Sequence, residues 1–313
     1  MLKWLVRIIV GLIAVVVLFV GGVFVAFSIW KSGQVRELEA GSEVIATALG
    51  DIEYADVGQG TPRLMIHGTP GGYDQTLVAH RVRPEAYPNV RFITVSRPGY
   101  LRTPVESGRT PAEQADLYAA LLDELGIDQV VVYAGSGGAP SGLQFALRHP
   151  ERTRALVLAV PLLERMESEE GAGRVSLTES LMSDMAVWAM GDRLLPMMLP
   201  DIDLDDPVQT ASAKLIIASG VPLGLRTDGM ENDMTQFRSL DVATWPLEEL
   251  QVPTLFLHGN ADENAPYEGS AAAAARIPNA ELITYEGGNH FIVITRAAEL
   301  SAEVEGFIEG LPD

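Results

Sequence analysis

The chain has 313 residues, of which 47% are hydrophobic and 20% are charged, so it is long enough for one large domain with a buried core or for two small ones. Its formal net charge of -20 gives an acidic surface that repels phosphate backbones, and we therefore expect no nucleic-acid partner. The absence of cysteine excludes disulfides, cysteine-ligated metals and thiol nucleophiles.

The N-terminus is unlike the rest of the chain. Residues 8–30, IIVGLIAVVVLFVGGVFVAFSIW, carry no charge, and at about 1.5 Å per residue in a helix they are long enough to cross a bilayer. Trp4 and Trp30 lie near the two ends, where amphipathic rings favour the membrane interface. The competing interpretation is a signal peptide, whose apolar core is typically about 7–15 residues long and ends in a small-x-small site, here Ala26 to Ser28. The longer run favours a membrane anchor.

Basic residues flank this segment on both sides. Lys3 and Arg7 precede it, whereas Lys31 and Arg36 follow it, so the distribution of positive charge barely distinguishes the two orientations. A short basic N-terminus usually remains in the cytoplasm. We therefore expect a single-pass membrane protein whose large C-terminal domain is extracytoplasmic.

The rest of the chain alternates between strand-like and helix-like segments. Residues 31–43 are polar and predict a short linker, and residues 43–58 predict two strands around a turn at Gly50 and Asp51. Further apolar runs predict strands at 63–67, 90–96, 129–134, 155–160, 253–258 and 280–285. These runs lack strict alternation, as expected for parallel strands covered on both faces. Residues 110–126 predict one of the intervening helices, and the alternation predicts an α/β fold, with a mostly parallel sheet and helices on both faces.

The alternation stops between about residues 162 and 250. This region contains eight of the ten methionines and acidic runs such as DIDLDD, which predicts an inserted helical cap. Methionine lines adaptable apolar surfaces, so these side chains either border a site for an apolar substrate or fill a loosely specified core. The predicted organisation is a membrane anchor and linker over residues 1–34, followed by a domain over residues 35–313 with its cap at about 162–250.

The segment VVYAGSGGAPSG, residues 131–142, places a serine between a predicted strand and a predicted helix. A tight strand-to-helix turn forces an unusual backbone angle at its tip, so the residues two before and two after the tip must be small. Ala134 and Gly138 meet this requirement around Ser136. The alternative, a phosphate-binding turn at a helix N-terminus, lacks the usual glycine spacing and the lysine that would follow it. We interpret Ser136 as a nucleophile.

A serine needs a base, and the base needs an orienting group, before it reacts near neutral pH. Among the five histidines, His290 lies in a loop after the last predicted strand without an evident turn or capping role. Asp262 follows the preceding strand, at the same edge of the sheet. The order Ser136, Asp262, His290 is that of a known catalytic triad. The other histidines are interpreted as structural, capping or surface residues: His67, His80, His149 and His258.

Loop motifs follow one another in a characteristic order and spacing. HGTPGG (67–72), AGSGG (134–138), HGNADENAP (258–266) and GGNHF (287–291) are similar to the oxyanion loop, nucleophile elbow, acid loop and histidine loop of the α/β-hydrolases. SRPGYLRTP (96–104) resembles the loop after the fourth strand in that family. The resemblance covers the chain after the linker and implies an α/β-hydrolase fold with a cap inserted after the sixth strand.

This resemblance implies a serine hydrolase that cleaves a carboxylic ester or a related acyl bond of a small, apolar molecule. Ser136 would attack the acyl carbon, His290 would transfer the proton, and Asp262 would hold the imidazole. Glu164 occupies a position used for the acid by some family members and is the alternative candidate to Asp262.

Two backbone N–H groups are expected to bind the oxyanion of the reaction. Gly137 follows the nucleophile and supplies one of them. Thr69 supplies the other, because Pro70 has no N–H to donate. The sequence contains no metal-binding cluster and no cofactor motif, so no cofactor is expected.

Alternatives to an esterase remain. HGTPGG is close to the HGGPG of proline iminopeptidases, which recognise a free amine through acidic groups of the cap; the candidates here are Glu164, Glu167, Glu169 and Glu170. A haloperoxidase-type perhydrolase would use the same triad. A hydrolase-like binding protein would have no turnover, but such proteins usually lack a triad member or the elbow glycines. A serine nucleophile argues against the dehalogenases and epoxide hydrolases of the family, which use an aspartate.

Overall fold

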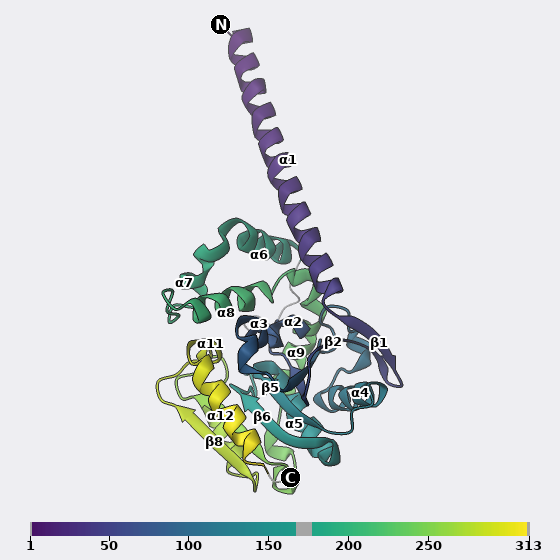
Figure 1. The fold of residues 1–313 in the computed structure, drawn as a ribbon. Coiled ribbons are helices and arrows are strands. Elements are labelled where there is room, and N and C mark those ends of the chain that lie inside the picture. Colours follow the sequence, from purple (N-terminus) through teal and green to yellow (C-terminus); the bar gives the residue numbers. More distant parts are fainter. Residues whose placement is uncertain (1, 167–176, 312–313) are drawn as a thin grey trace.

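The computed structural model describes residues 2–166 and 177–311. Its strands are β1 (Glu43–Thr47), β2 (Gly50–Gly58), β3 (Thr61–Ile66), β4 (Val90–Val95), β5 (Val130–Gly135), β6 (Thr153–Ala159), β7 (Thr254–Gly259) and β8 (Ala280–Tyr285). They form one eight-stranded sheet in the order β1-β2-β4-β3-β5-β6-β7-β8 (Figure 1). The pairs from β4 to β8 are parallel, whereas β1 and β2 are antiparallel additions at one edge. The predicted mostly parallel sheet is confirmed.

The first hairpin turns two residues earlier than the sequence predicted. β1 ends at Thr47 and β2 begins at Gly50, so Ala48 and Leu49 form the turn. Gly50 has a φ of 137°, a value that residues with a side chain rarely adopt. The glycine is therefore the first residue of the second strand, where its conformation closes the turn.

Helices cover both faces of the sheet, because alternate residues of the central strands pack in two separate cores. Val130 and Val132 of β5 pack in the larger core, with α4 (Pro111–Glu124) and α5 (Ala139–Arg148). Val131 packs in the other core, with α11 (Ile292–Thr295) and α12 (Ala297–Glu309). Outside the segment between β6 and β7, the helices after the first are α2 (Tyr73–Thr76), α3 (Val78–Val82), α4 (Pro111–Glu124), α5 (Ala139–Arg148), α10 (Tyr267–Ala274), α11 (Ile292–Thr295) and α12 (Ala297–Glu309). The sheet is thus buried on both sides, which explains its continuous apolar runs.

The described part of the segment between β6 and β7 is mainly helical, and this segment is called the cap below. It contains α6 (Leu177–Met190), α7 (Leu195–Met198), α8 (Pro207–Ala218) and α9 (Thr227–Ser239). Helices α6, α7 and α8 lie on the side of the domain from which the N-terminal helix projects, whereas α9 lies further into the domain (Figure 1).

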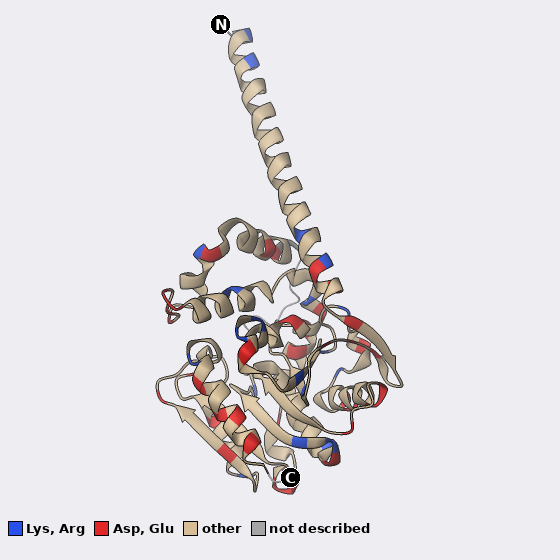
Figure 2. Ribbon diagram, viewed as in Figure 1, with Lys and Arg blue, Asp and Glu red and all other residues tan. Residues whose placement is uncertain are grey.

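The N-terminal helix, α1 (Leu2–Ala40), is continuous and projects far from the domain (Figure 1). Its charged residues lie at its two ends (Figure 2). Among the described residues it is the one helix long and apolar enough to cross a membrane, and its most apolar 18-residue window has a mean hydropathy of 3.2 and is 0% buried.

The prediction of a linker at residues 31–43 is wrong for residues 31–40, because α1 continues as a helix to Ala40. Contacts with the domain stabilise these polar turns. Lys31 pairs with Asp184 of α6 at 2.6 Å, and the Tyr73 hydroxyl donates to the Leu38 carbonyl oxygen at 2.7 Å. The last turns of α1 are therefore part of the folded domain.

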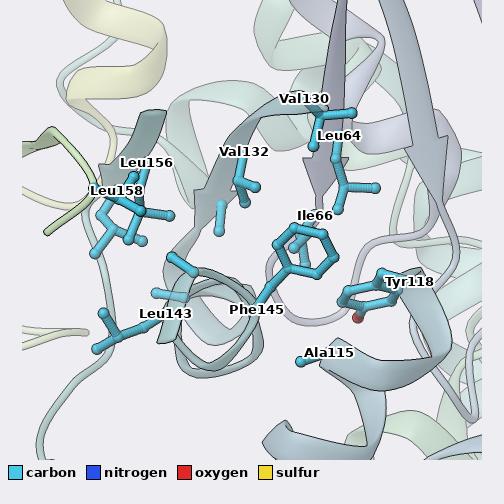
Figure 3. Packing of buried hydrophobic residues seen from close by; sticks show 14 of the residues in the cluster. Leu64, Ile66, Ala115, Tyr118, Val130, Val132, Leu143, Phe145, Leu156 and Leu158 are labelled. Atoms are coloured by element: carbon cyan, nitrogen blue, oxygen red, sulfur yellow. The ribbon is translucent and has the colours of Figure 1, made fainter. Parts of the chain in front are cut away.

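The large core gives a direct test of the packing. Phe145 of α5 is 0% exposed and lies between the sheet and Tyr118 of α4 (Figure 3). We expect Phe145→Ala to lower the free energy of unfolding by about 3–5 kcal/mol, because it removes a buried ring and leaves a cavity. The control, Leu49→Ala in the exposed β1–β2 turn, should change it by less than about 0.5 kcal/mol. Denaturant unfolding in detergent, followed by circular dichroism, measures both; equal losses would contradict the expectation.

Candidate active site

Ser136 lies at the tip of the turn between β5 and α5. Its φ is 47°, in the left-handed region that is costly for a residue with a side chain. The strand ends at Gly135, a short 3-10 turn spans Ser136–Gly138, and α5 begins at Ala139. The Ser136 carbonyl oxygen accepts a hydrogen bond from the Leu162 N–H at 3.1 Å, which ties the turn to the segment after β6. The backbone strain is therefore held at the serine itself.

Two glycines let a neighbouring loop approach the serine closely. A Cβ at Gly138 would overlap the carbonyl oxygen of His67, and a Cβ at Gly137 would lie 2.7 Å from Thr69 Oγ1. A side chain at either position would push the HGTPGG loop away. This close approach places Thr69 and Gly137 side by side, next to Ser136.

Side chains that follow three parallel strands meet at the carboxyl edge of the sheet. His290 Nε2 lies 3.0 Å from Ser136 Oγ, and His290 Nδ1 lies 2.7 Å from Asp262 Oδ2. Asp262 follows β7 and His290 follows β8, just as Ser136 follows β5. The structure brings together the serine, imidazole and carboxylate predicted from the sequence.

The Asp262 carboxylate is buried and held by several donors. Its Oδ1 accepts the N–H groups of Asn264 at 2.8 Å and Ala265 at 2.9 Å, and its Oδ2 also faces His258 Nε2 at 3.1 Å. Burial alone would raise the pKa of this carboxyl, but hydrogen bonds from His258 and His290, together with attraction to His290, outweigh it and hold the pKa below its usual range. Asp262 is therefore ionised at neutral pH.

His258 supports this carboxylate with a defined tautomer. Its Nε2 faces the Ala265 carbonyl oxygen at 3.0 Å and the Asp262 carboxylate, and because both only accept, Nε2 carries the proton. Ser270 Oγ lies 2.6 Å from Nδ1 and holds the other side of the ring. The residue that the sequence suggested as structural thus orients Asp262.

His67 is also a structural residue. Its ring is buried, Nδ1 donates to the Gly68 carbonyl oxygen at 2.6 Å, and Nε2 accepts the Arg97 N–H at 2.9 Å. Burial and the nearby charge of Arg97 hold the pKa of His67 well below its usual value. With both nitrogens engaged, this neutral ring has no free position for proton transfer.

A buried charge network lies behind the HGTPGG loop, and its central residue, Asp233, had no signal in the sequence. Asp233 belongs to α9 of the cap and is 1% exposed. Its carboxylate accepts bonds from Thr69 Oγ1 at 2.5 Å, from the Tyr100 hydroxyl at 2.5 Å, and from Arg97 at 2.7 and 2.5 Å. The motif SRPGYLRTP contains both Arg97 and Tyr100, but a single aspartate on a cap helix shows nothing of its partners.

The protonation states in this network follow from burial and charge. Burial opposes the charge on Arg97, but attraction to Asp233 and hydrogen bonds to it outweigh burial and raise the pKa of the guanidinium. Burial and the Asp233 charge raise the pKa of Tyr100 well above its usual value. Arg97 is therefore a cation and Tyr100 a neutral donor, and together they tie α9 of the cap to the loop that carries Thr69.

A cavity of about 520 Å³ lies beside the nucleophile turn and is lined by both Ser136 and His290. Its walls are mostly apolar and include Met65, Val78, Phe92, Ile217, Val293 and Leu300. The cavity also reaches Arg63 of β3. Arg63 precedes His67 by four residues, so at about 3.3 Å per residue the two backbone positions are about 13 Å apart. There the guanidinium of Arg63 binds both oxygens of Glu305, at 2.7 and 2.6 Å.

In the part of the chain that the structure describes, the carboxylate that contacts His290 is Asp262, and Glu164 does not contact this ring. The Glu164 side chain packs beside Gly269 instead. Glu167, Glu169 and Glu170 lie outside the described residues. Within the described ranges 2–166 and 177–311, no group of three or more His, Asp or Glu side chains is placed to hold a metal ion.

The sheet order, the turn at Ser136 and the helical insertion after β6 define an α/β-hydrolase fold. The chain matches the family model described as the alpha/beta hydrolase family over residues 64–303, and it belongs to that family. It is 31% identical to a solved alpha/beta hydrolase fold protein from Nakamurella multipartita, with a TM-score of 0.72 over 85% of this chain and 98% of that chain.

Curated relatives agree with this assignment. The 2-hydroxymuconate semialdehyde hydrolase of Pseudomonas putida is 28% identical over 291 residues, which cover 86% of this chain and 94% of that protein. The uncharacterized hydrolase YcgS of Bacillus subtilis (strain 168) is 40% identical over 116 residues, which cover 37% of this chain and 40% of that protein. The chain is therefore an enzyme of the hydrolase class.

The Asp233 network predicts a large effect of a small substitution. Asp233→Asn leaves the buried Arg97 cation beside a neutral amide, and we expect it to lower the free energy of unfolding by about 3–5 kcal/mol. The matched control is Asp56→Asn, which breaks an ion pair with Arg91 whose two side chains are 32% and 33% exposed. That control should cost less than about 1 kcal/mol. Denaturant unfolding compares the two variants, and similar losses would show that the network carries no special weight.

Proposed function

We propose that the protein is a serine hydrolase that cleaves a carboxylic ester or a related acyl bond of a small, apolar molecule. Ser136 is the nucleophile, His290 the base and Asp262 the orienting acid. The proposal is supported chiefly by the two contacts of one imidazole, 3.0 Å to Ser136 Oγ and 2.7 Å to Asp262 Oδ2. An imidazole bonded to both groups can take a proton from the serine while the carboxylate holds its tautomer.

The reaction proceeds in two halves. His290 Nε2 takes the proton of Ser136 as Oγ bonds to the acyl carbon, and the Asp262 carboxylate stabilises the imidazolium that forms. The imidazolium then protonates the leaving oxygen, and the alcohol departs. Water attacks the acyl-enzyme with His290 again as base, which releases the acid and restores the serine.

The oxyanion of each tetrahedral intermediate binds to the backbone N–H groups of Gly137 and Thr69. Their closeness to each other and to Ser136 supports this assignment. Asp233 acts on the same loop at one remove, because it accepts the hydrogen bond from Thr69 Oγ1. It is a positioning residue that fixes the loop before the substrate binds.

The charged groups of the cavity favour an uncharged substrate over the free amine that an aminopeptidase would bind. Among the described residues that line it, the one carboxylate is Glu305, which is already bonded to Arg63. A free amine, as an aminopeptidase would bind, therefore has no described acidic partner in the cavity. A perhydrolase would use the same three side chains, and a binding protein without turnover would have no need for the bonded serine and imidazole.

We also propose that residues 8–30 remain attached as a single-pass membrane anchor, with the domain on the extracytoplasmic side. Phe27 lies inside this run, yet it is 2% exposed and packs against Trp188 of the cap. Cleavage after Ser28 would remove this ring from its buried position. A segment that contributes to the folded domain is better suited to an anchor than to a discarded signal peptide.

The triad is tested with a fluorophosphonate on the full-length protein in detergent, with the adduct mapped by mass spectrometry. We expect the adduct on Ser136 and expect Ser136→Ala to lower kcat for a short-chain nitrophenyl ester by at least about 10³-fold. Ser141→Ala, one helical turn further on, is the matched control and should retain both the label and the activity. Labelling of the Ser136→Ala protein at the same rate would refute the assignment.

The choice between the two acids is tested in the same assay. Asp262→Asn should lower kcat by about 10⁴-fold, because the amide cannot hold the imidazole in the required tautomer or stabilise its charge. Glu164→Gln should leave kcat within about twofold. The reverse order of effects would transfer the role of the acid to Glu164. Esters, lactones, amides and 2-hydroxymuconate semialdehyde are compared as substrates of the wild-type enzyme.

The anchor is tested by fractionation of cells that express the full chain with a C-terminal epitope. The protein should sediment with membranes and be extracted by detergent but not by high salt or alkaline carbonate, because the apolar run lies in the hydrocarbon core. Protease added to spheroplasts should remove the epitope. Recovery of a soluble chain that begins near Ile29 would show cleavage, and a protected epitope would reverse the orientation.

A further inference from the structure

Cap helix α6 lies level with the end of the apolar run of α1. Trp188 of α6 packs edge-on against Phe27, with the ring centroids 5.7 Å apart, and Phe27 also stacks on Trp30 at 5.9 Å. Residues 8–30 are the proposed membrane span, so Phe27 and Trp30 lie where that span meets the headgroups. The end of α6 that contacts Phe27 must therefore lie at the same depth relative to the bilayer.

A buried ion pair holds α6 against α1. Lys31 Nζ lies 2.6 Å from Asp184 Oδ2, and Asp184 is 0% exposed. The other oxygen of Asp184 accepts the Leu223 N–H at 2.8 Å. A buried carboxylate that loses its counter-charge is strongly destabilised, so the cap stays attached to the helix. The orientation of the cap relative to a bilayer is therefore set by α1.

The cap exposes large apolar side chains, and one of them borders the cavity. On α6 and α7, in the part that the structure describes, the exposed large apolar side chains are Met182, Met197 and Met198, at 64%, 68% and 52% exposure. Met198 also lines the cavity that contains Ser136 and His290. A side chain that is half exposed and also part of the cavity wall lies where the cavity opens. These three residues are called the methionine surface.

We propose that the methionine surface rests in the headgroup region of the bilayer and that an ester lipid passes Met198 to reach Ser136. This inference rests on the proposed serine hydrolase and its anchor. The position of α1 argues for a bilayer as the occupant, because the helix projects from the side of the domain on which α6 and α7 lie (Figure 1). Lipid would cover apolar side chains that water otherwise hydrates, and it would deliver a poorly soluble substrate directly.

The charge and the cavity restrict the lipid. The net charge of -20, spread over the domain as acidic side chains (Figure 2), disfavours an anionic bilayer and leaves a zwitterionic or uncharged one. The mostly apolar cavity, which is lined both by Ser136 and by Arg63 of β3, suits an acyl chain whose carbonyl lies at the serine. Ser136 Oγ would take the acyl group, the lipid alcohol would leave with the proton from His290, and water would then release the fatty acid.

Docking is tested first, with a readout that needs no turnover. Because the chain has no cysteine, Met197→Cys gives a single site for an environment-sensitive fluorophore on the full-length protein in phosphatidylcholine vesicles. We expect blue-shifted emission and quenching by a headgroup spin-labelled lipid. Leu49→Cys, at a 53% exposed site in the β1–β2 turn, is the matched control and should report water. Equal emission and equal quenching at the two sites would overturn the docking.

The substrate is tested with the double variant Met182→Gln, Met197→Gln in the same vesicles. For umbelliferyl oleate held in the bilayer, kcat/KM should fall by about tenfold or more, whereas for water-soluble nitrophenyl butyrate it should stay within about twofold. Equal loss on both esters, or no loss on either, would overturn the route from the bilayer. If the wild-type enzyme hydrolyses neither ester, the serine-hydrolase proposal fails, and the labelled cysteines still decide the docking.

Discussion

The candidate site depends on how closely the backbone can approach Ser136. The serine has a φ of 47°, and the positions after it have no room for a side chain, since a Cβ at Gly138 would overlap the His67 carbonyl oxygen. Bare backbone at these positions lets the loop after β3 lie against the start of α5. The same approach places Thr69 beside Gly137. On its other side, Ser136 Oγ lies 3.0 Å from the His290 ring. A larger residue at Gly137 or Gly138 would push this loop, and Thr69 with it, away from the serine.

Buried carboxylates connect this site to the rest of the molecule. Asp262 is held by two imidazoles and two backbone N–H groups, so its charge is retained despite burial. Asp233 joins the cap to the loop of Thr69 through Arg97 and Tyr100, and Asp184 joins the cap to α1 through Lys31. Each charge is costly to bury alone and is stabilised only when its partner is in place. The cap is thus fixed at both ends, to the site and to the N-terminal helix.

Much of the fold could be read from the sequence because its signals are local. Apolar runs of strand length predicted β3 to β8, and the small residues around Ser136 predicted a sharp turn there. Asp262 and His290 could be placed near the serine because parallel strands end at one edge of the sheet. Their contacts agree with that placement, and their catalytic roles stay a prediction until the labelling experiment. The first hairpin was misplaced by two residues, since a glycine with a positive φ is as suitable at the start of a strand as in a turn.

The sequence by itself determined the parallel sheet, the helical insertion and the sharp turn at Ser136, because each of these follows from short-range patterns of apolar and small residues. The loops that carry Asp262 and His290 were identified from their places after predicted strands and from the resemblance to the α/β-hydrolases. Only the tertiary structure decided that α1 continues to Ala40 and that Asp233 accepts a bond from Thr69. A polar stretch becomes helix or linker according to what it packs against, and an aspartate gains its role from the cation beside it. Residues 69 and 233 are far apart in the chain, and only folding brings them into contact.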